Sequence, residues 1–185
     1  MPPIIAWIEI AACWIAWAYP YAFLAPHVQK RESITAAGPT RVGLLLEVIA
    51  VAVAFLPRPP APRSGIAALL AALAFGIAGA WLAWTAVPHL GKQFRVHAGL
   101  YIDHELVRTG PYSIVRHPIY ASILALLLAT IVLLTPWPRA ILSLALFVIG
   151  TEIRVRCEDG LLASRFGEQF RQYQKSVPAY VPFVR

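Results

Sequence analysis

Apolar residues form four long stretches that short polar segments separate. The stretches cover residues 4–26, 42–56, 66–90 and 119–149, and the run Thr-Pro-Trp-Pro-Arg at 135–139 divides the last one into two halves. A helix needs about 20 apolar residues to cross a bilayer, and flanking residues can extend the shorter stretches. The pattern therefore predicts an all-α integral membrane protein with about five transmembrane helices. The last two helices are expected to form a tight hairpin.

Composition and charge support this fold class and add an orientation. The chain is 59% hydrophobic and only 14% charged, with a mean hydropathy of +0.65. If the N-terminus is outside, thirteen of the sixteen basic residues fall on the inner segments, and the outer ones are Arg58, Arg63 and Arg139. The positive-inside rule then predicts an external N-terminus and a cytoplasmic C-terminus. The net charge of +7 favours anionic lipid headgroups over nucleic acid as partners, because no soluble binding domain is evident.

The most informative block runs from Gly110 to Tyr120. Pro118 fits the first position of a helix, so Arg116 and His117 would stand at the entrance of the apolar segment that follows. The positive end of that helix favours an anion, which the two side chains would bind with charge-assisted hydrogen bonds. His117 is also a candidate proton carrier. The alternative is that both side chains extend to lipid headgroups.

Helical spacing continues past the membrane border over 154–176, with Gly167 as its weak point, and predicts a cytoplasmic C-terminal helix followed by an aromatic tail. Arg154 and Glu158 share one face of this helix, and Glu152 and Arg156 share a roughly opposite one. Only one pair can face the bundle centre. The alternative is that both are structural ion pairs that end the membrane span. For Glu47, inside the second apolar stretch, pairing with a basic side chain is preferred over contact with a substrate.

Several blocks in order resemble the isoprenylcysteine carboxyl methyltransferase family and its wider relatives, the phospholipid N-methyltransferases. The first two are His104-Glu105-Leu106-Val107-Arg108-Thr109-Gly110-Pro111-Tyr112 and Arg116-His117-Pro118-Ile119-Tyr120. The third combines Arg154 with Glu158-Asp159, and the fourth is Phe166-Gly167 with Phe170 and Tyr173. Asp159 stands where the family has a second Glu. The resemblance covers about 91–185, whereas 1–90 match only as three generic membrane helices of the same single membrane domain.

The resemblance implies S-adenosylmethionine as methyl donor and a cofactor-binding catalytic region within 91–185. The residues that it places around the donor are His104, Tyr112, Arg116, His117, Pro118, Tyr120 and Glu158, with Tyr180, Pro182 and Phe183 closing over the adenine. It makes Arg154 the residue that orients an anionic acceptor on an apolar tail, such as the carboxylate of a prenylated cysteine. Glu158 or His117 would act as a base only if the acceptor is an amine or a thiol.

Other functions fit parts of the same pattern. A phospholipid amine or a small thiol stays open as the acceptor, although the polar residues around Arg154 favour an anionic acceptor on an apolar tail. A sterol-reductase-like protein that uses NADPH shares a similar Arg-His-x-x-Tyr block and an aromatic tail. A membrane scaffold without catalytic activity is the third alternative. Convergence of Arg116, His117, Arg154 and Glu158 on one cavity distinguishes an enzyme from a scaffold.

Overall fold

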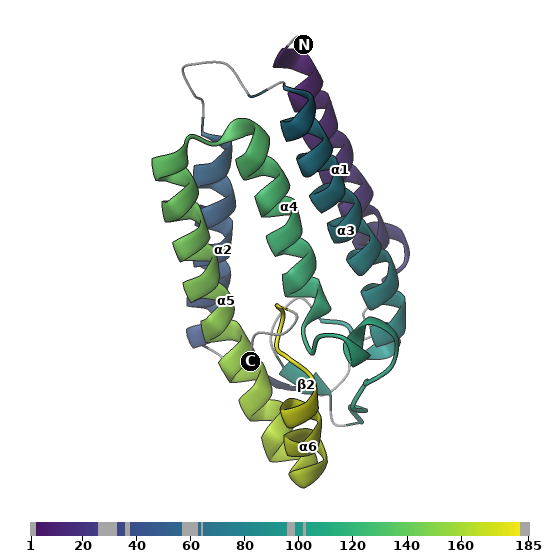
Figure 1. Cartoon of the computed structure of the whole chain (residues 1–185). Helices are drawn as coiled ribbons and strands as arrows, with labels where there is room; N and C mark the ends of the chain where they lie inside the picture. Colours follow the sequence, from purple (N-terminus) through teal and green to yellow (C-terminus); the bar gives the residue numbers. More distant parts are fainter. Residues whose placement is uncertain are drawn as a thin grey trace.

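The computed structural model describes residues 3–25, 33–35, 38–56, 63, 65–95, 99–101 and 103–181. Its main elements are helices, which confirms the all-α prediction (Figure 1). They are α1 (Pro3–Phe23), α2 (Pro39–Phe55), α3 (Ile66–Leu90), α4 (Pro118–Leu134), α5 (Trp137–Phe166) and α6 (Glu168–Ser176). Two short 3-10 helices, η1 (Gly91–Gln93) and η2 (Gly110–Ser113), and two strands, β1 (Ser33–Thr35) and β2 (Gly99–Tyr101), complete the described elements.

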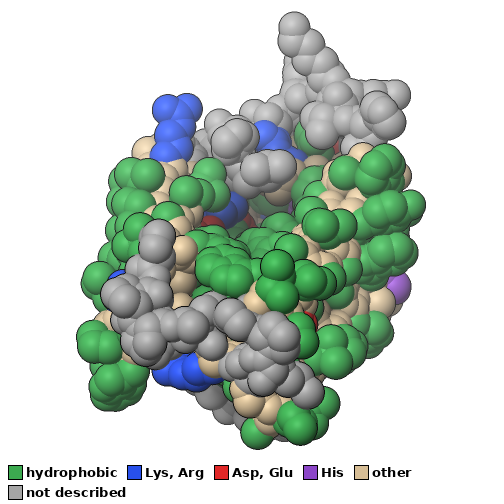
Figure 2. Space-filling model, turned by 90° about the horizontal axis from the view of Figure 1, so that it is seen from above, with side chains coloured by type: hydrophobic (Ala, Val, Ile, Leu, Met, Phe, Trp, Pro, Cys, Tyr) green, Lys and Arg blue, Asp and Glu red, His purple; other side chains and the backbone are tan. Residues whose placement is uncertain are grey.

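The outer surface of the bundle is apolar. Among the described residues, the segments Ile4–Phe23 and Ile66–Gln93 are long and apolar enough to cross a membrane, and Pro118–Leu134 is a shorter apolar helix. Large apolar side chains such as Ile15 and Leu70 point outward, and green side chains line the sides of the bundle in the end-on view of Figure 2. A helix that is apolar on its outer face suits a lipid environment. Two of the five predicted spans thus meet the criterion of length and composition.

The bundle consists of two groups of helices on either side of α4. Helix α3 packs on α4 and α1, whereas α5 packs mainly on α2 (Figure 1). The α2–α5 crossing is close because both helices carry glycine there: a Cβ on Gly43 would lie 2.6 Å from the carbonyl oxygen of Gly150. Thr135 and Pro136 alone connect α4 to α5, yet these two helices contact other helices more than each other. The expected tight hairpin is therefore wrong in its packing, and the divergence of α4 and α5 leaves room between them.

A short antiparallel pairing, which the sequence did not predict, joins two connecting segments at one end of the bundle. Strand β1 pairs with β2, with Ser33 opposite Tyr101 and Thr35 opposite Gly99. The segment that follows α1 and the segment that follows α3 therefore lie at the same end. This arrangement agrees with the alternation of inner and outer segments in the predicted topology.

The C-terminal part of the chain returns to the start of α4. Helix α5 continues beyond its apolar part to Phe166 and ends at Gly167, whose φ of +52° favours glycine. After α6, the chain crosses the entrance of α4, where the backbone N–H groups of Arg116 and His117 donate to the carbonyls of Pro178 and Ala179, both at 2.8 Å. The predicted continuation of the last helix is confirmed, and the tail is held against the α4 entrance.

Candidate functional site

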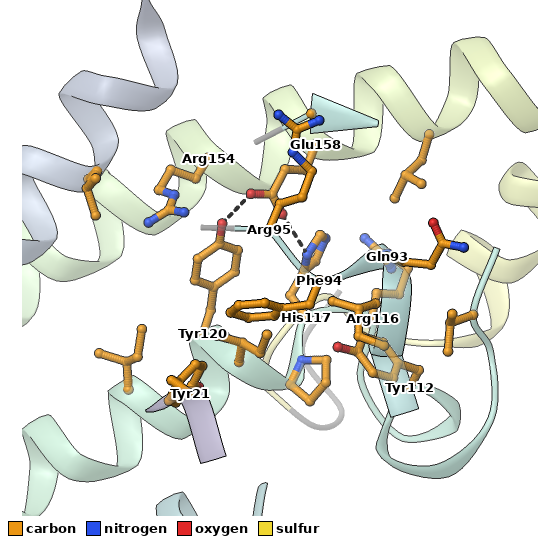
Figure 3. Close-up of a pocket in the computed structure, with 18 of the residues that line it drawn as sticks. Tyr21, Gln93, Phe94, Arg95, Tyr112, Arg116, His117, Tyr120, Arg154 and Glu158 are labelled. Atoms are coloured by element: carbon orange, nitrogen blue, oxygen red, sulfur yellow. Dashed lines mark hydrogen bonds and ion pairs between the residues drawn. The ribbon is translucent and has the colours of Figure 1, made fainter. Parts of the chain in front are cut away.

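A cavity of about 600 Å³ lies between the two helix groups, at the end of the bundle where the tail docks. It is lined by seven of the ten residues predicted to surround a cofactor: His104, Tyr112, Arg116, His117, Pro118, Tyr120 and Glu158. Arg154 also lines it. Figure 3 shows Arg154, Tyr120, Glu158 and His117 grouped around one side of this space. The convergence that separates an enzyme from a scaffold is therefore present in the structure.

The anionic groups at the entrance of α4 are two carboxylates of the protein itself, those of Glu158 and Asp159. His117 precedes Pro118, the first residue of α4, and its Nδ1 lies 3.4 Å from Glu158 Oε2 while its Nε2 lies 2.9 Å from Asp159 Oδ1. Burial lowers the pKa of His117, but hydrogen bonds to Asp159 and Glu158 outweigh it and raise the pKa to about 9. The ring is then an imidazolium at neutral pH. With both nitrogens facing carboxylates, it has no lone pair to accept a proton.

Arg116 and Asp159 form the buried centre of this network. Arg116 Nη2 donates to Asp159 Oδ2 at 2.9 Å, and Arg116 Nη1 donates to the carbonyls of Gln174, at 3.2 Å, and Val177. Gln174 Nε2 also donates to Asp159, at 3.0 Å. Burial raises the pKa of Asp159, but His117 and Arg116 outweigh it and hold the pKa below the usual range. Arg116 therefore uses one terminal nitrogen to bind Asp159 and the other to hold the end of α6 and the start of the tail, although the residue reaches the cavity wall.

Arg154 is paired across the bundle with Glu47 of α2. Arg154 Nη1 donates to Glu47 Oε2 at 2.7 Å, and Thr151 Oγ1 donates to the other carboxylate oxygen at 2.9 Å. The guanidinium lies over the Tyr120 ring, 4.9 Å from its centroid, and the Tyr120 hydroxyl donates to Glu158. The preferred interpretation of Glu47 as a partner of a basic side chain is confirmed. Arg154 and Glu158 face the cavity, as one of the two predicted faces must.

The opposite face carries the other pair. Arg156 Nε lies 3.3 Å from Glu152 Oε2, and the Arg156 side chain is 70% exposed. Tyr180 donates to Glu152 at 3.3 Å and packs with Val155 and Tyr120. Tyr180 does not line the cavity, so its position does not support the prediction that it closes over an adenine. Pro182 and Phe183 lie outside the described residues.

One part of the cavity wall is apolar. We define the apolar arm as the space between Trp14, Trp17 and Ala18 of α1, Leu44, Val48 and Val51 of α2, and Ile123 of α4. Sequence reasoning did not assign these residues to the site. The spacing of positions 14, 17 and 21, which places three aromatic residues on one helix face, was the signal that could have found the α1 wall.

Gln93 is a second residue that sequence reasoning missed. It lines the cavity and is 4% exposed, and neither its Oε1 nor its Nε2 has a hydrogen-bond partner among the described residues. Leaving a buried polar group unpaired costs about 1–3 kcal/mol. A ligand that offers both a donor and an acceptor would satisfy this amide. No local sequence pattern distinguishes Gln93 from any other polar residue in a loop.

The family model described as isoprenylcysteine carboxyl methyltransferase (ICMT) matches residues 71–164. That range is half of the chain and contains both the 104–120 blocks and the Arg154–Asp159 segment. The chain belongs to the isoprenylcysteine carboxyl methyltransferase family. This match confirms the resemblance of the motifs. The cavity-lining residues Tyr120, Arg154 and Glu158 all lie within the matched range.

Individual relatives agree with this assignment. The protein-S-isoprenylcysteine O-methyltransferase of Schizosaccharomyces pombe is 34% identical over 116 residues, which cover 61% of this chain and 49% of that protein. The enzyme of the same name from Tribolium castaneum is 33% identical over 111 residues, or 58% of this chain and 39% of that protein. The chain thus spans half or less of the length of these relatives.

A relative with a different printed name also matches. The cobalt-zinc-cadmium resistance protein CzcN of Cupriavidus metallidurans is 37% identical over 93 residues, which cover 48% of this chain and 42% of that protein. In the part of the chain that the structure describes, no group of three or more His, Cys, Asp or Glu side chains is placed to hold a metal ion.

Proposed function

We propose that this member of the isoprenylcysteine carboxyl methyltransferase family is an S-adenosylmethionine-dependent membrane methyltransferase that modifies the carboxylate of a lipophilic acceptor, most specifically a prenylated cysteine. The observation that carries the proposal is a single cavity in which Arg154, Glu158 and His117 lie next to an apolar arm. A lipophilic acid needs both environments within reach of one another. Family membership supports the reaction type.

The residues of the cavity fit the methyl donor. The Gln93 amide is buried without a partner among the described residues, and it matches the paired donor and acceptor groups of an adenine edge. Glu158, with a side chain 22% exposed, has a carboxylate suited to an ammonium group or to ribose hydroxyls. When bound, S-adenosylmethionine supplies an electrophilic methyl group that an oxygen nucleophile can displace in line.

Arg154 is the residue that we assign to the acceptor. Its guanidinium lies between Glu47 and the Tyr120 ring, and this fixed position lets it hold a carboxylate close to Glu158. An ionised carboxylate needs no general base, which is consistent with an imidazolium at His117. Burial of the acceptor's apolar chain in the apolar arm would exclude water and align the acceptor carboxylate. Alignment and desolvation are the main contributions that an enzyme can make to this displacement.

We also propose that α1 to α5 all cross the membrane, with the N-terminus outside and the cavity opening on the cytoplasmic side. Helices α2 and α4 have 17 residues each, a length of about 25 Å, which a modestly thinned bilayer accommodates. Exposed Leu45 on α2 and Leu142 on α5 support contact with lipid. Accessibility of single cysteines introduced at each end of the bundle tests this orientation.

Binding and transfer assays test the proposed activity separately. We expect the purified protein in detergent to bind S-adenosylhomocysteine in calorimetry, and Glu158→Ala to weaken this binding at least tenfold, about 1.4 kcal/mol. Arg154→Ala should retain the binding but lose methyl transfer to a prenylcysteine analogue. Arg156→Ala, on the exposed face of the same helix, is the matched control and should change neither. Absence of binding by the wild type would refute the proposal, and transfer only to lipid amines would redirect it to a phospholipid acceptor.

A further inference from the structure

The apolar arm ends at Trp14. Along α1, Trp17 and then Trp14 line the arm with increasing distance from the charged end, and Leu44, Val48 and Val51 do so along α2. Beyond this level the interior is filled, because Trp14 and Phe55 pack against the buried residues Ala6, Ile10, Leu133 and Leu134. The arm is therefore a closed pocket in that direction.

The Trp14 side chain is fixed in this position from two sides. Its Nε1 donates to Thr130 Oγ1 of α4 at 3.1 Å, and its ring centroid lies 5.9 Å from that of Phe55 on α2. Trp17 is held similarly, since its Nε1 donates to Ser122 Oγ at 2.9 Å. With their polar atoms bonded to α4, both indoles present apolar surface to the arm. A ring held by a hydrogen bond and by aromatic packing cannot move aside at low cost.

The position of Trp14 sets the length of the arm. From Leu44 to Val51 the α2 wall extends over seven residue steps, which at a rise of 1.5 Å per residue is about 10 Å. The α1 wall from Tyr21 to Trp14 has the same length by the same argument. Trp14 and Phe55 join α1 to α2 where these walls end.

We infer that Trp14, supported by Phe55, is the residue that determines the longest apolar tail that the acceptor site accepts. The inference rests on the proposed function, because it concerns the tail of that acceptor. Each methylene that enters the arm should raise kcat/KM about fourfold. Once the tail reaches the indole, further methylenes find no space, and overpacking of the fixed ring opposes them.

The test uses N-acetylcysteines that carry S-alkyl chains of graded length, from butyl to hexadecyl, as methyl acceptors. For the wild type we expect kcat/KM to rise with chain length to a break point and then to stop rising. Trp14→Ala should move the break point to longer chains and raise the preference for a long over a short chain at least tenfold. Trp14→Phe should move it less, and Phe55→Ala should move it in the same direction as Trp14→Ala.

Trp81→Ala is the matched control, because it removes an indole that is 53% exposed on α3 and should leave the break point unchanged. Retained binding of S-adenosylhomocysteine shows that each variant is folded. A break point that stays in place in Trp14→Ala and Phe55→Ala, or a uniform loss at all lengths, would overturn the assignment of Trp14. So would a wild-type profile with no break point, since the tail would then leave the cavity between the helices. A folded wild type that methylates no chain of any length would instead overturn the proposed function.

Discussion

Two adjacent carboxylates on α5 have different environments, and replacing each one tests the account of the site. Asp159 accepts hydrogen bonds from Arg116 and His117, both at 2.9 Å, and from Gln174 at 3.0 Å. Asp159→Asn keeps the shape but leaves two buried cations without this charge. Breaking a buried ion pair by removing one partner costs about 3–5 kcal/mol, so we expect a loss of stability of that size.

Glu158 lines the cavity and its side chain is more exposed than that of Asp159, at 22% against 9%. Glu158→Gln should therefore lose less stability, about 1–2 kcal/mol, while it weakens binding of S-adenosylhomocysteine. Glu168→Gln provides the baseline, because the Glu168–Arg171 pair is exposed on both sides and contributes about 0–1 kcal/mol.

Denaturant titration in detergent micelles, followed by fluorescence of the six tryptophans, measures the three variants under the same conditions. Limited proteolysis provides a second readout, because Asp159→Asn leaves one acceptor oxygen for three donors and so weakens the contact of Gln174 that holds the chain near the tail. If Asp159→Asn is no less stable than Glu168→Gln, the buried network does not hold the site together and the reasoning is wrong.

Three further predictions concern other parts of the structure. The pKa of His117 rises from 6.5 to about 9 on folding, so its contribution to stability should be complete below pH 6.5 and lost as the pH rises through about 9. Unfolding titrations across this range should show that the free energies of unfolding of wild type and His117→Gln converge at high pH. Gln93→Leu should stabilise the ligand-free protein in thermal unfolding but weaken S-adenosylhomocysteine binding. If Gln93 had only a structural role, the same substitution would lower both the stability and the binding affinity. Gly43→Ala should destabilise the α2–α5 crossing by about 1–3 kcal/mol, because the new Cβ would lie 2.6 Å from backbone and side-chain atoms of α5. Gly160→Ala is the control, because the space around its Cβ is open, and it should not reduce the stability.

The sequence predicted the parts of the molecule that depend on local signals. Apolar stretches predicted the helices and Pro118 predicted the start of α4. Helical spacing predicted the extension past residue 154 with Gly167 as its weak point, and the structure divides the helix there into α5 and α6. Helical spacing placed Arg154 and Glu158 on one face, and the bundle turns that face toward the cavity. These features follow from the period of the helix and from the backbone preferences of proline and glycine.

The partners of the charged groups could not be read from the sequence. Arg116 was assigned to a ligand but holds Val177 and Asp159, because its choice among several acceptors depends on where the tail crosses α4. Helix α5 packs on α2 rather than on α4, and the glycines of that crossing, Gly43 and Gly150, are distant in sequence. Gln93 was missed because its burial is a property of the folded bundle alone.

The docking of the tail on α4 also has a consequence for biosynthesis. The carbonyls of Pro178 and Ala179 bond to the amides of Arg116 and His117, about 60 residues earlier in the chain. Arg116 and His117 are synthesised before Pro178 and Ala179, because synthesis proceeds from the N-terminus. During that interval the buried cations of the α4 entrance lack Asp159 as well as the tail. The nascent chain therefore carries an incomplete, charged site at the α4 entrance, and the site can close only after Asp159 and the segment that contains Pro178 and Ala179 have been added.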